Sequence, residues 1–117
     1  MKGAVCDYDA KCMLINDSRS KILVRYSDVR YIKSENVYLK VVTESKSYLM
    51  RKKLTDMESE LSGGSFVRIH RSYIVGLDYV SAFDGKSVIM TDGTQLPLSR
   101  GCVKQFKDAV MNYLHEF

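Results

Sequence analysis

The chain has 117 residues, of which 45% are hydrophobic and 27% are charged, and its formal net charge is +4. This length fits one domain with one core, and the composition is typical of a globular protein rather than a disordered one. No apolar run approaches the roughly 18 residues of a membrane span, and the first residues lack the basic and apolar regions of a secretory signal. We therefore expect a cytoplasmic protein with no membrane contact.

Basic residues gather in the middle of the sequence. Residues 21–53 carry nine basic and three acidic side chains, whereas residues 54–61 carry three acidic side chains and no basic one. This distribution favours a polyanionic partner. A basic face that meets only solvent is the alternative.

Catalytic and metal-binding patterns find little support in the sequence. The cysteines, Cys6, Cys12 and Cys102, are an odd number without a CxxC pair, and His70 and His115 lie far apart. We therefore expect neither a disulfide framework nor a structural zinc site. The sequence also lacks GxSxG, HExxH, a P-loop and GxGxxG, so we expect no enzyme and no cofactor.

Short β-like runs fill most of the chain, separated by turn signals at the spacing of a β-rich domain. The Asp84-Gly85 and Asp92-Gly93 pairs predict tight hairpins, so the last three strands should form a meander. Pro97 cannot donate a ladder hydrogen bond, which places its strand at a sheet edge. The predicted strands are residues 11–15, 21–26, 29–33, 36–42, 47–51, 66–70, 77–83, 87–91 and 94–98.

Two segments predict helices. In residues 53–64, Thr55 and Glu58 have the spacing of a capping box, and two glycines follow as a stop signal. In residues 100–117, Ser99 stands at the N-cap position and apolar residues recur at steps of three and four. The apolar positions of this C-terminal helix are Val103, Phe106, Val110, Leu114 and Phe117.

The stretch FVRIHRSYIVGLDYV, residues 66–80, breaks the pattern of its own strand. Val67 and Ile69 should face the core, with Arg68 and His70 on the other face. Arg71 then falls on the apolar side. It must be paired there at some cost, or the strand must already have ended so that the side chain points elsewhere.

Three places in the chain offer side chains suited to phosphates and base edges. Arginine can pair bidentately with guanine, asparagine can pair with adenine, and serine or lysine can bind phosphate. The candidate DNA-binding residues are Lys33, Asn36 and Tyr38 in the turn KSENVY, Arg68, His70, Arg71 and Ser72 at the strand end, and Ser99, Arg100 and Lys104 at the head of the last helix.

Each of these places also has a purely structural alternative. Asn36 is routine in a hairpin turn, and Ser99 can be only an N-cap. Arg68 can pair with an acid across the sheet, and His70 can be a half-buried histidine with satisfied hydrogen bonds. Arg71 is the most informative residue, because departures from a local rule tend to occur at functional or strained sites.

The stretch at residues 66–80, together with RYSDVRYIKSENVYLKVV upstream and LPLSR downstream, resembles the LytTR family of bacterial DNA-binding domains. The resemblance runs from about residue 11 to the C-terminus, and its central motif is specific: Phe, Arg and His alternate before Arg-Ser. It implies a mostly β fold with about ten short strands in small antiparallel sheets, one short helix and a C-terminal helix. Residues 1–10 would be an extension and residues 11–117 the domain.

The resemblance also implies that loops, rather than a helix, enter successive major grooves of duplex DNA. The family's contact positions fall on Asn36 and Tyr38, on His70 and Arg71, and on Arg100. Such domains usually follow a receiver domain in response regulators of two-component systems. The chain contains no receiver, so we expect an excised domain or a stand-alone regulator of transcription.

Two positions depart from the family pattern, and two other functions stay open. Gly76 stands where family members often have asparagine, and Gly101 where many have a basic or polar residue. The alternatives are a β-rich protein-interaction module with a basic face, and an OB-type binder of single strands or RNA that stacks bases on tyrosines. For the DNA reading, we expect repeated half-sites and a monomer that dimerises on DNA or through a receiver domain.

Overall fold

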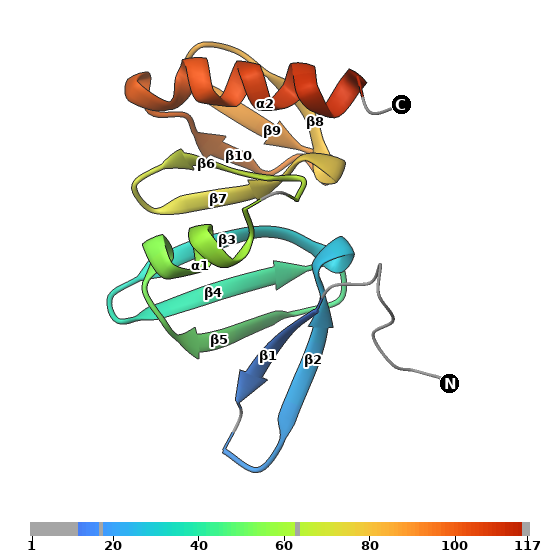
Figure 1. Ribbon diagram of the computed structural model, residues 1–117, viewed down its shortest axis with the longest axis vertical. Coiled ribbons are helices and arrows are strands. Elements are labelled where there is room, and N and C mark those ends of the chain that lie inside the picture. Colours follow the sequence, from blue (N-terminus) through green and yellow to red (C-terminus); the bar gives the residue numbers. More distant parts are fainter. Residues whose placement is uncertain (1–11, 17, 63, 116–117) are drawn as a thin grey trace.

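The computed structural model describes residues 12–16, 18–62 and 64–115, so the predicted extension at residues 1–10 lies outside the described part of the chain. Strands dominate, in three antiparallel sheets of two, five and three strands (Figure 1). This is the mostly β fold expected. The strands are β1 (Cys12–Asn16), β2 (Lys21–Arg25), β3 (Val29–Glu35), β4 (Tyr38–Thr43), β5 (Ser47–Arg51), β6 (Phe66–His70), β7 (Tyr73–Gly76), β8 (Val80–Phe83), β9 (Ser87–Met90) and β10 (Gln95–Pro97).

The central sheet has the order β5-β4-β3-β7-β6 and is antiparallel throughout. Its edges, β5 and β6, do not pair with each other, so it is not the closed barrel of the OB-type alternative. Because every neighbour is antiparallel, the β3–β4 turn, the β6–β7 turn and the end of β5 all lie at one end of the sheet. We call this end the loop end.

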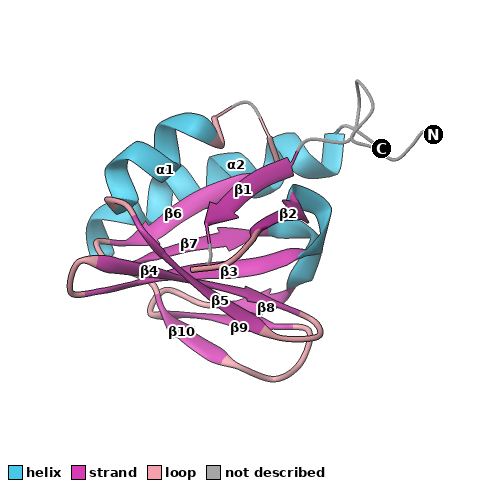
Figure 2. Cartoon of the chain, turned by 90° about the horizontal axis from the view of Figure 1, so that it is seen from below, coloured by secondary structure: helices cyan, strands magenta, loops and turns pink. Residues whose placement is uncertain are grey.

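Two hydrophobic clusters lie on opposite faces of the central sheet, because neighbouring residues of a strand point in opposite directions. Ile32 and Ile74 belong to a cluster with β1, β2 and α1, whereas Val75 belongs to a cluster with β9, β10 and α2. Strands β3 and β7 therefore hold both cores together. In Figure 2 both helices lie along one side of the molecule, and β8, β9 and β10 lie on the other.

The C-terminal meander confirms the turn signals of the sequence. Strands β8, β9 and β10 pair in that order, and β10 is an edge strand that ends at Pro97. The Asp84 carboxylate accepts hydrogen bonds from the N–H groups of Lys86 and Ser87, both at 2.8 Å, and Gly93 adopts φ +92°. These are the side-chain bond and the positive φ that favour Asp-Gly in hairpins.

The helices form where the sequence predicts them, but without the predicted caps. Helix α1 (Leu54–Glu60) begins after Lys53, so Thr55 lies inside the helix and the capping-box prediction is wrong. Ser99 precedes a 3₁₀ turn (Arg100–Cys102) and makes no side-chain cap hydrogen bond; α2 (Val103–His115) follows. No helix among the described residues is long and apolar enough to cross a bilayer.

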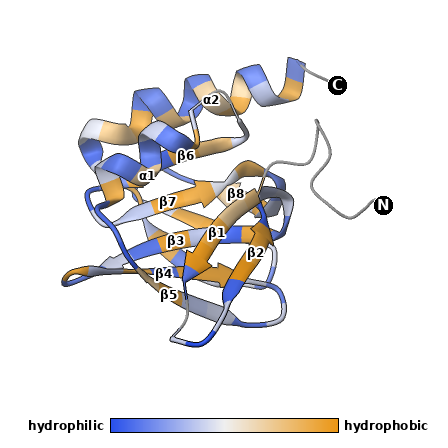
Figure 3. Cartoon of the chain, turned by 60° about the horizontal axis from the view of Figure 1, so that its bottom comes forward, coloured by the Kyte–Doolittle hydropathy of each residue, from blue (hydrophilic) through white to orange (hydrophobic). Residues whose placement is uncertain are grey.

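One face of α2 packs on the domain through to Tyr113 in its last turn, but Leu114 lies outside this face. Phe106 is completely buried and Val110 is half-buried, as their spacing predicts. Leu114 is 57% exposed, so the prediction that it packs against the domain is wrong. Apolar and polar positions alternate along the length of the helix (Figure 3).

Three further features are not predicted by the sequence: an additional strand, a close contact at a glycine and a disulfide bond. Strand β7 was absent from the predicted strands; its last three residues, Ile74 to Gly76, are all buried, so it lacks the alternation that marks a half-buried strand. Gly76 has no room for a side chain, because an added Cβ would lie 2.7 Å from the carbonyl oxygen of Val29. Cys12 is disulfide-bonded, whereas Cys102 is free.

Candidate nucleic-acid interface

Backbone hydrogen bonds join the three predicted contact regions at the loop end. Ser34 lies near the end of β3, and its N–H donates to the carbonyl oxygen of Ser72 in the β6–β7 turn at 2.8 Å. The N–H of Ser99 donates to the carbonyl oxygen of Ile69 in β6, also at 2.8 Å. Both turns and the start of α2 lie on the left of Figure 1. Residues more than sixty positions apart in the sequence are thereby held as one surface.

The β3–β4 turn presents an amide and an aromatic ring to solvent. Asn36 adopts φ +58°, a left-handed conformation that asparagine tolerates better than most residues. Val37 and Tyr38 beside it are 52% and 43% exposed. The turn is therefore a tight two-residue hairpin whose side chains are not used by the core.

The β6–β7 turn explains why Arg71 can follow a strand on its apolar side. Val67 and Ile69 are buried, as their spacing predicts, and the strand ends at His70. Arg71 then lies in an exposed turn rather than on the buried face. The core thus anchors the strand, and its end delivers a cationic side chain to the surface.

Arg68 is engaged on three sides by the protein itself. Its Nε donates to the carbonyl oxygen of His70 at 3.2 Å, and its Nη2 donates to that of Arg71 at 2.7 Å. Its Nη1 forms a 3.1 Å ion pair with the Glu58 carboxylate on α1. The guanidinium therefore fastens the turn to the strand and to the helix.

The His70 ring is oriented by the same turn. Its Nδ1 accepts a hydrogen bond from the N–H of Ser72 at 3.1 Å, and the His70 and Tyr73 rings form a T-shaped contact with a centroid distance of 5.7 Å. Because Nδ1 is an acceptor, the neutral ring carries its proton on Nε2. His70 can therefore act as a hydrogen-bond donor through Nε2.

Lys33 lies on β3 beside the same aromatic pair. Its Nζ is 3.4 Å from the Glu35 carboxylate and 6.0 Å from the centre of the Tyr73 ring. The electrostatic interaction with Tyr73, followed by the hydrogen bond and the charge of Glu35, raises the pKa of Lys33. The side chain is therefore a cation at neutral pH, and it is placed next to both turns.

The third region is the junction between β10 and α2. Ser99 accepts the N–H of Cys102 on its carbonyl oxygen at 2.9 Å, which starts the 3₁₀ turn at Arg100. Arg100 and Lys104 are both exposed. The structure therefore brings all three predicted regions together, with Arg68 as the one candidate whose hydrogen-bonding groups are largely occupied within the protein.

Sequence reasoning missed a further basic segment at the loop end. Arg51 is the last residue of β5, Lys52 and Lys53 connect that strand to α1, and Lys52 forms an ion pair with Glu60. With Arg71 across from it, this connection lines a groove of about 660 Å³. Three consecutive basic residues after an edge strand were the available signal. Their proximity to Arg71 depends on strand order, which the sequence does not display.

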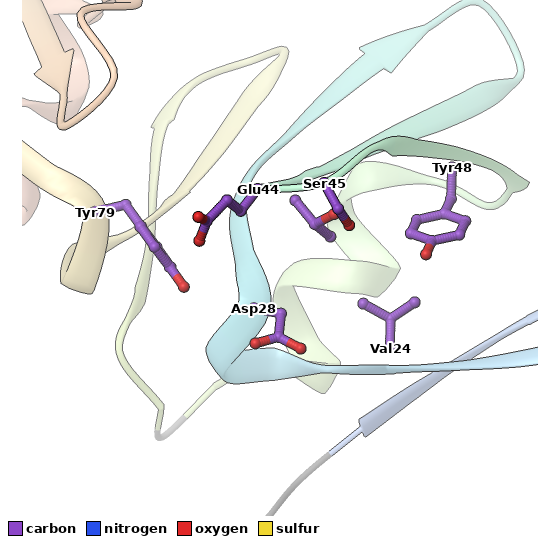
Figure 4. Close-up of a pocket in the computed structure, with 7 residues that line it drawn as sticks. Val24, Asp28, Glu44, Ser45, Tyr48 and Tyr79 are labelled. Carbon is purple, nitrogen blue, oxygen red and sulfur yellow. The ribbon is translucent and has the colours of Figure 1, made fainter.

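The opposite end of the sheet carries an acidic pocket. A pocket of about 510 Å³ lies there, and its described lining includes Asp28 and Glu44 but no lysine or arginine (Figure 4). Burial, followed by the negative charges of Asp28, Asp78 and Glu44, raises the pKa of Tyr79 in the same pocket. The acidic pocket and the cationic groove therefore lie at opposite ends of the central sheet.

Known proteins share both the sequence pattern and the fold. A family model described as the LytTr DNA-binding domain matches residues 19–111. The chain is 28% identical over 100 residues to the sensory transduction protein LytT of Bacillus subtilis, covering 81% of this chain and 42% of LytT. It is 32% identical over 93 residues to the heme-containing CO-sensing transcriptional regulator RcoM 2 of Paraburkholderia xenovorans, covering 74% of this chain and 35% of that protein.

A solved structure has the same fold. The LytTr DNA-binding domain of a putative methyl-accepting/DNA response regulator from Bacillus cereus superposes with a TM-score of 0.74 at 23% identity. The match covers 85% of this chain and 95% of that domain. The chain spans less than half the length of the two curated relatives described above, so it corresponds to one part of each of them.

Proposed function

The chain belongs to the LytTR family of DNA-binding domains, and we propose that its loop end reads duplex DNA sequence-specifically in a bacterial transcriptional regulator. One observation carries this proposal. Two backbone hydrogen bonds, Ser34 to Ser72 and Ser99 to Ile69, hold three polar and cationic loops on one surface. A surface of this kind can present several side chains to a groove at once without a recognition helix.

The side chains divide by chemistry into base readers and phosphate binders. Arg71 and Arg100 carry the fork that can bond two acceptors of guanine, and Asn36 can pair with adenine. His70 offers its Nε2 proton to a base or a phosphate. The side chains left to position the DNA backbone are Lys33, Tyr38, Ser72, Ser99 and Lys104.

Arg68 takes a supporting part in this proposal. Its three hydrogen bonds hold the turn that carries His70 and Arg71. A side chain whose donors are occupied in this way acts on DNA through the residues that it positions. The acidic pocket with Asp28 and Glu44 lies at the other end of the sheet, so the loop end is the end that we expect to face a polyanion.

Regulation by this domain should need two copies. One loop surface of a domain this small covers few base pairs, so repeated half-sites and two domains would supply the affinity. We propose that the isolated chain is a monomer and that dimers form on DNA or through a sensory or receiver module in the cytoplasm. Light scattering of the chain without DNA tests this, because a stable dimer would contradict it.

The DNA reading is tested by selection followed by binding. Duplexes selected from a random pool give the preferred site, and fluorescence anisotropy then compares that duplex with a scrambled duplex, with single strands and with RNA. We expect the preferred duplex to bind most tightly, with log affinity falling by about 0.9 per neutralised phosphate for each unit of log salt. Equal affinity for all four ligands would refute sequence-specific duplex reading, and a flat salt dependence would favour a protein partner.

A further inference from the structure

The groove beside the β6–β7 turn has a charge that the protein does not balance. Its lining includes five cationic side chains and a single carboxylate, that of Asp56. The lining residues are Ser34, Asn36, Val37, Arg51, Lys52, Lys53, Leu54, Thr55, Asp56, Arg68 and Arg71. A concave surface with one sign of charge concentrates its field and attracts counter-ions.

Two of the five cations already have partners, and three do not. Lys52 pairs with Glu60 and Arg68 pairs with Glu58, both acids of α1. Among the described residues, no carboxylate forms an ion pair with Arg51, Lys53 or Arg71. The paired cations fix the walls of the groove, and the three unpaired ones remain for an external anion.

The positions of Arg51 and Lys53 indicate which kind of anion the groove would bind. Arg51 ends the edge strand β5, opposite Tyr38 of β4 in the ladder, and Lys53 is the last residue before α1. Neither residue stands at the tip of a hairpin, as Arg71 does. They line the same groove as the turn residues Asn36, Val37 and Arg71. The backbone of a duplex would pass along this groove if the two turns entered the major groove.

We propose that this groove binds the phosphate backbone of the same duplex that the loops read, with Arg51 and Lys53 as phosphate contacts. The inference rests on the proposed function and extends its footprint to a strand segment beside the bases. Such contacts add affinity and salt dependence but no discrimination, because phosphates are alike in every sequence. They also fix the angle at which the domain meets the helix axis.

The test compares two double variants that lose the same charge. Arg51→Gln with Lys53→Gln removes the groove cations, and Arg25→Gln with Lys46→Gln removes one arginine and one lysine away from the loop end. Anisotropy at several salt concentrations is measured for each on the preferred and the scrambled duplex. Circular dichroism melts confirm that each variant is folded. If the groove pair does not fold, the single variant Lys53→Gln replaces it in the test.

We expect the groove pair to make the slope of log affinity against log salt shallower by about 1.8, or about 0.9 for Lys53→Gln alone. Both duplexes should weaken by the same factor, and the control pair should keep the parent slope. A groove pair whose slope equals that of the control pair overturns the inference. A parent protein that does not prefer its selected duplex instead refutes the proposed function, so the two failures are distinguishable.

Discussion

Removal of the Arg68 guanidinium is the sharpest test of how the β6–β7 turn is held. Arg68→Met keeps an unbranched stem of similar length but loses the bonds to two carbonyl oxygens and to Glu58. The side chain is only 20% exposed and that of Glu58 is 40% exposed, so the ion pair is partly screened. Each bond to a carbonyl contributes about 1 kcal/mol and the pair about 0.5, so the free energy of unfolding should fall by about 2–3 kcal/mol.

Urea denaturation measures this loss, provided that the slope of the transition is unchanged. Glu58→Gln is the matched control, because it removes only the charge of one partner and should cost about 0.5 kcal/mol. Under conditions where both variants are folded, Arg68→Met should lose discrimination between the preferred and scrambled duplexes and keep the parent salt slope. A variant with parent stability that binds all duplexes more weakly would mean that Arg68 is itself a phosphate contact and that the positioning role is wrong.

Four further substitutions have outcomes that follow from the role of a single side chain or backbone position. Arg71→Ala and Arg100→Ala should each weaken binding to the preferred duplex by about 1–3 kcal/mol and to a scrambled duplex much less, as measured by anisotropy, and lysine variants that bind both duplexes as the parent does would refute base reading. Gly76→Ala should lower the free energy of unfolding by about 1–3 kcal/mol, measured by urea denaturation, because its Cβ would lie 2.7 Å from a main-chain oxygen. An unchanged free energy would show that the sheet can shift. Hydrogen bonds from main-chain N–H groups lower the pKa of Asp84 and of Asp92, so the stability they provide is present above the unfolded pKa of about 3.8 and is lost as pH falls through the folded values. In thermal melts, Asp84→Asn should therefore lose less stability on acidification below about pH 4 than the parent does.

The parts of the fold that follow a local rule could be predicted from the sequence. Val67 and Ile69 alternate with polar residues, and they are buried. Asp84 and Gly93 occur in turns whose bonds and φ values need those residue types, and these two turns join the three strands of the meander. In each case one face or one turn decides the residue type, so a few neighbouring residues contain the whole signal.

The parts that were missed depend on contacts between distant segments. Strand β7 is enclosed by β3 and β6 and buried on both faces, so its sequence shows a plain apolar run. Thr55 has the spacing of a cap, yet α1 starts earlier because Leu54 is buried in the core cluster with Met57. Tertiary packing here overrides a local preference worth about 1 kcal/mol.

The residues of the candidate site also fall into those that the local sequence reveals and those that depend on contacts between distant segments. Arg71 was recognised from a broken alternation, which is visible within a few residues of the sequence. The contribution of Arg51 and Lys53 becomes visible only when β5 is placed at the edge of the sheet with its end toward the β6–β7 turn. The occupied state of Arg68 likewise depends on Glu58, which approaches it from a helix.

The strand order of the central sheet also determines the distance between the β3–β4 and β6–β7 turns. Strands β4, β3, β7 and β6 are consecutive neighbours, so the midpoints of the β3–β4 and β6–β7 turns are two strand spacings apart. Two spacings amount to about 10 Å, and B-DNA rises about 3.4 Å for each base pair. Base pairs contacted by the two turns would therefore lie about three steps apart along the helix. Selected duplexes should show this interval between their two most constrained positions. Insertion of one base pair between those two positions should weaken binding more than substitution of a base pair between them.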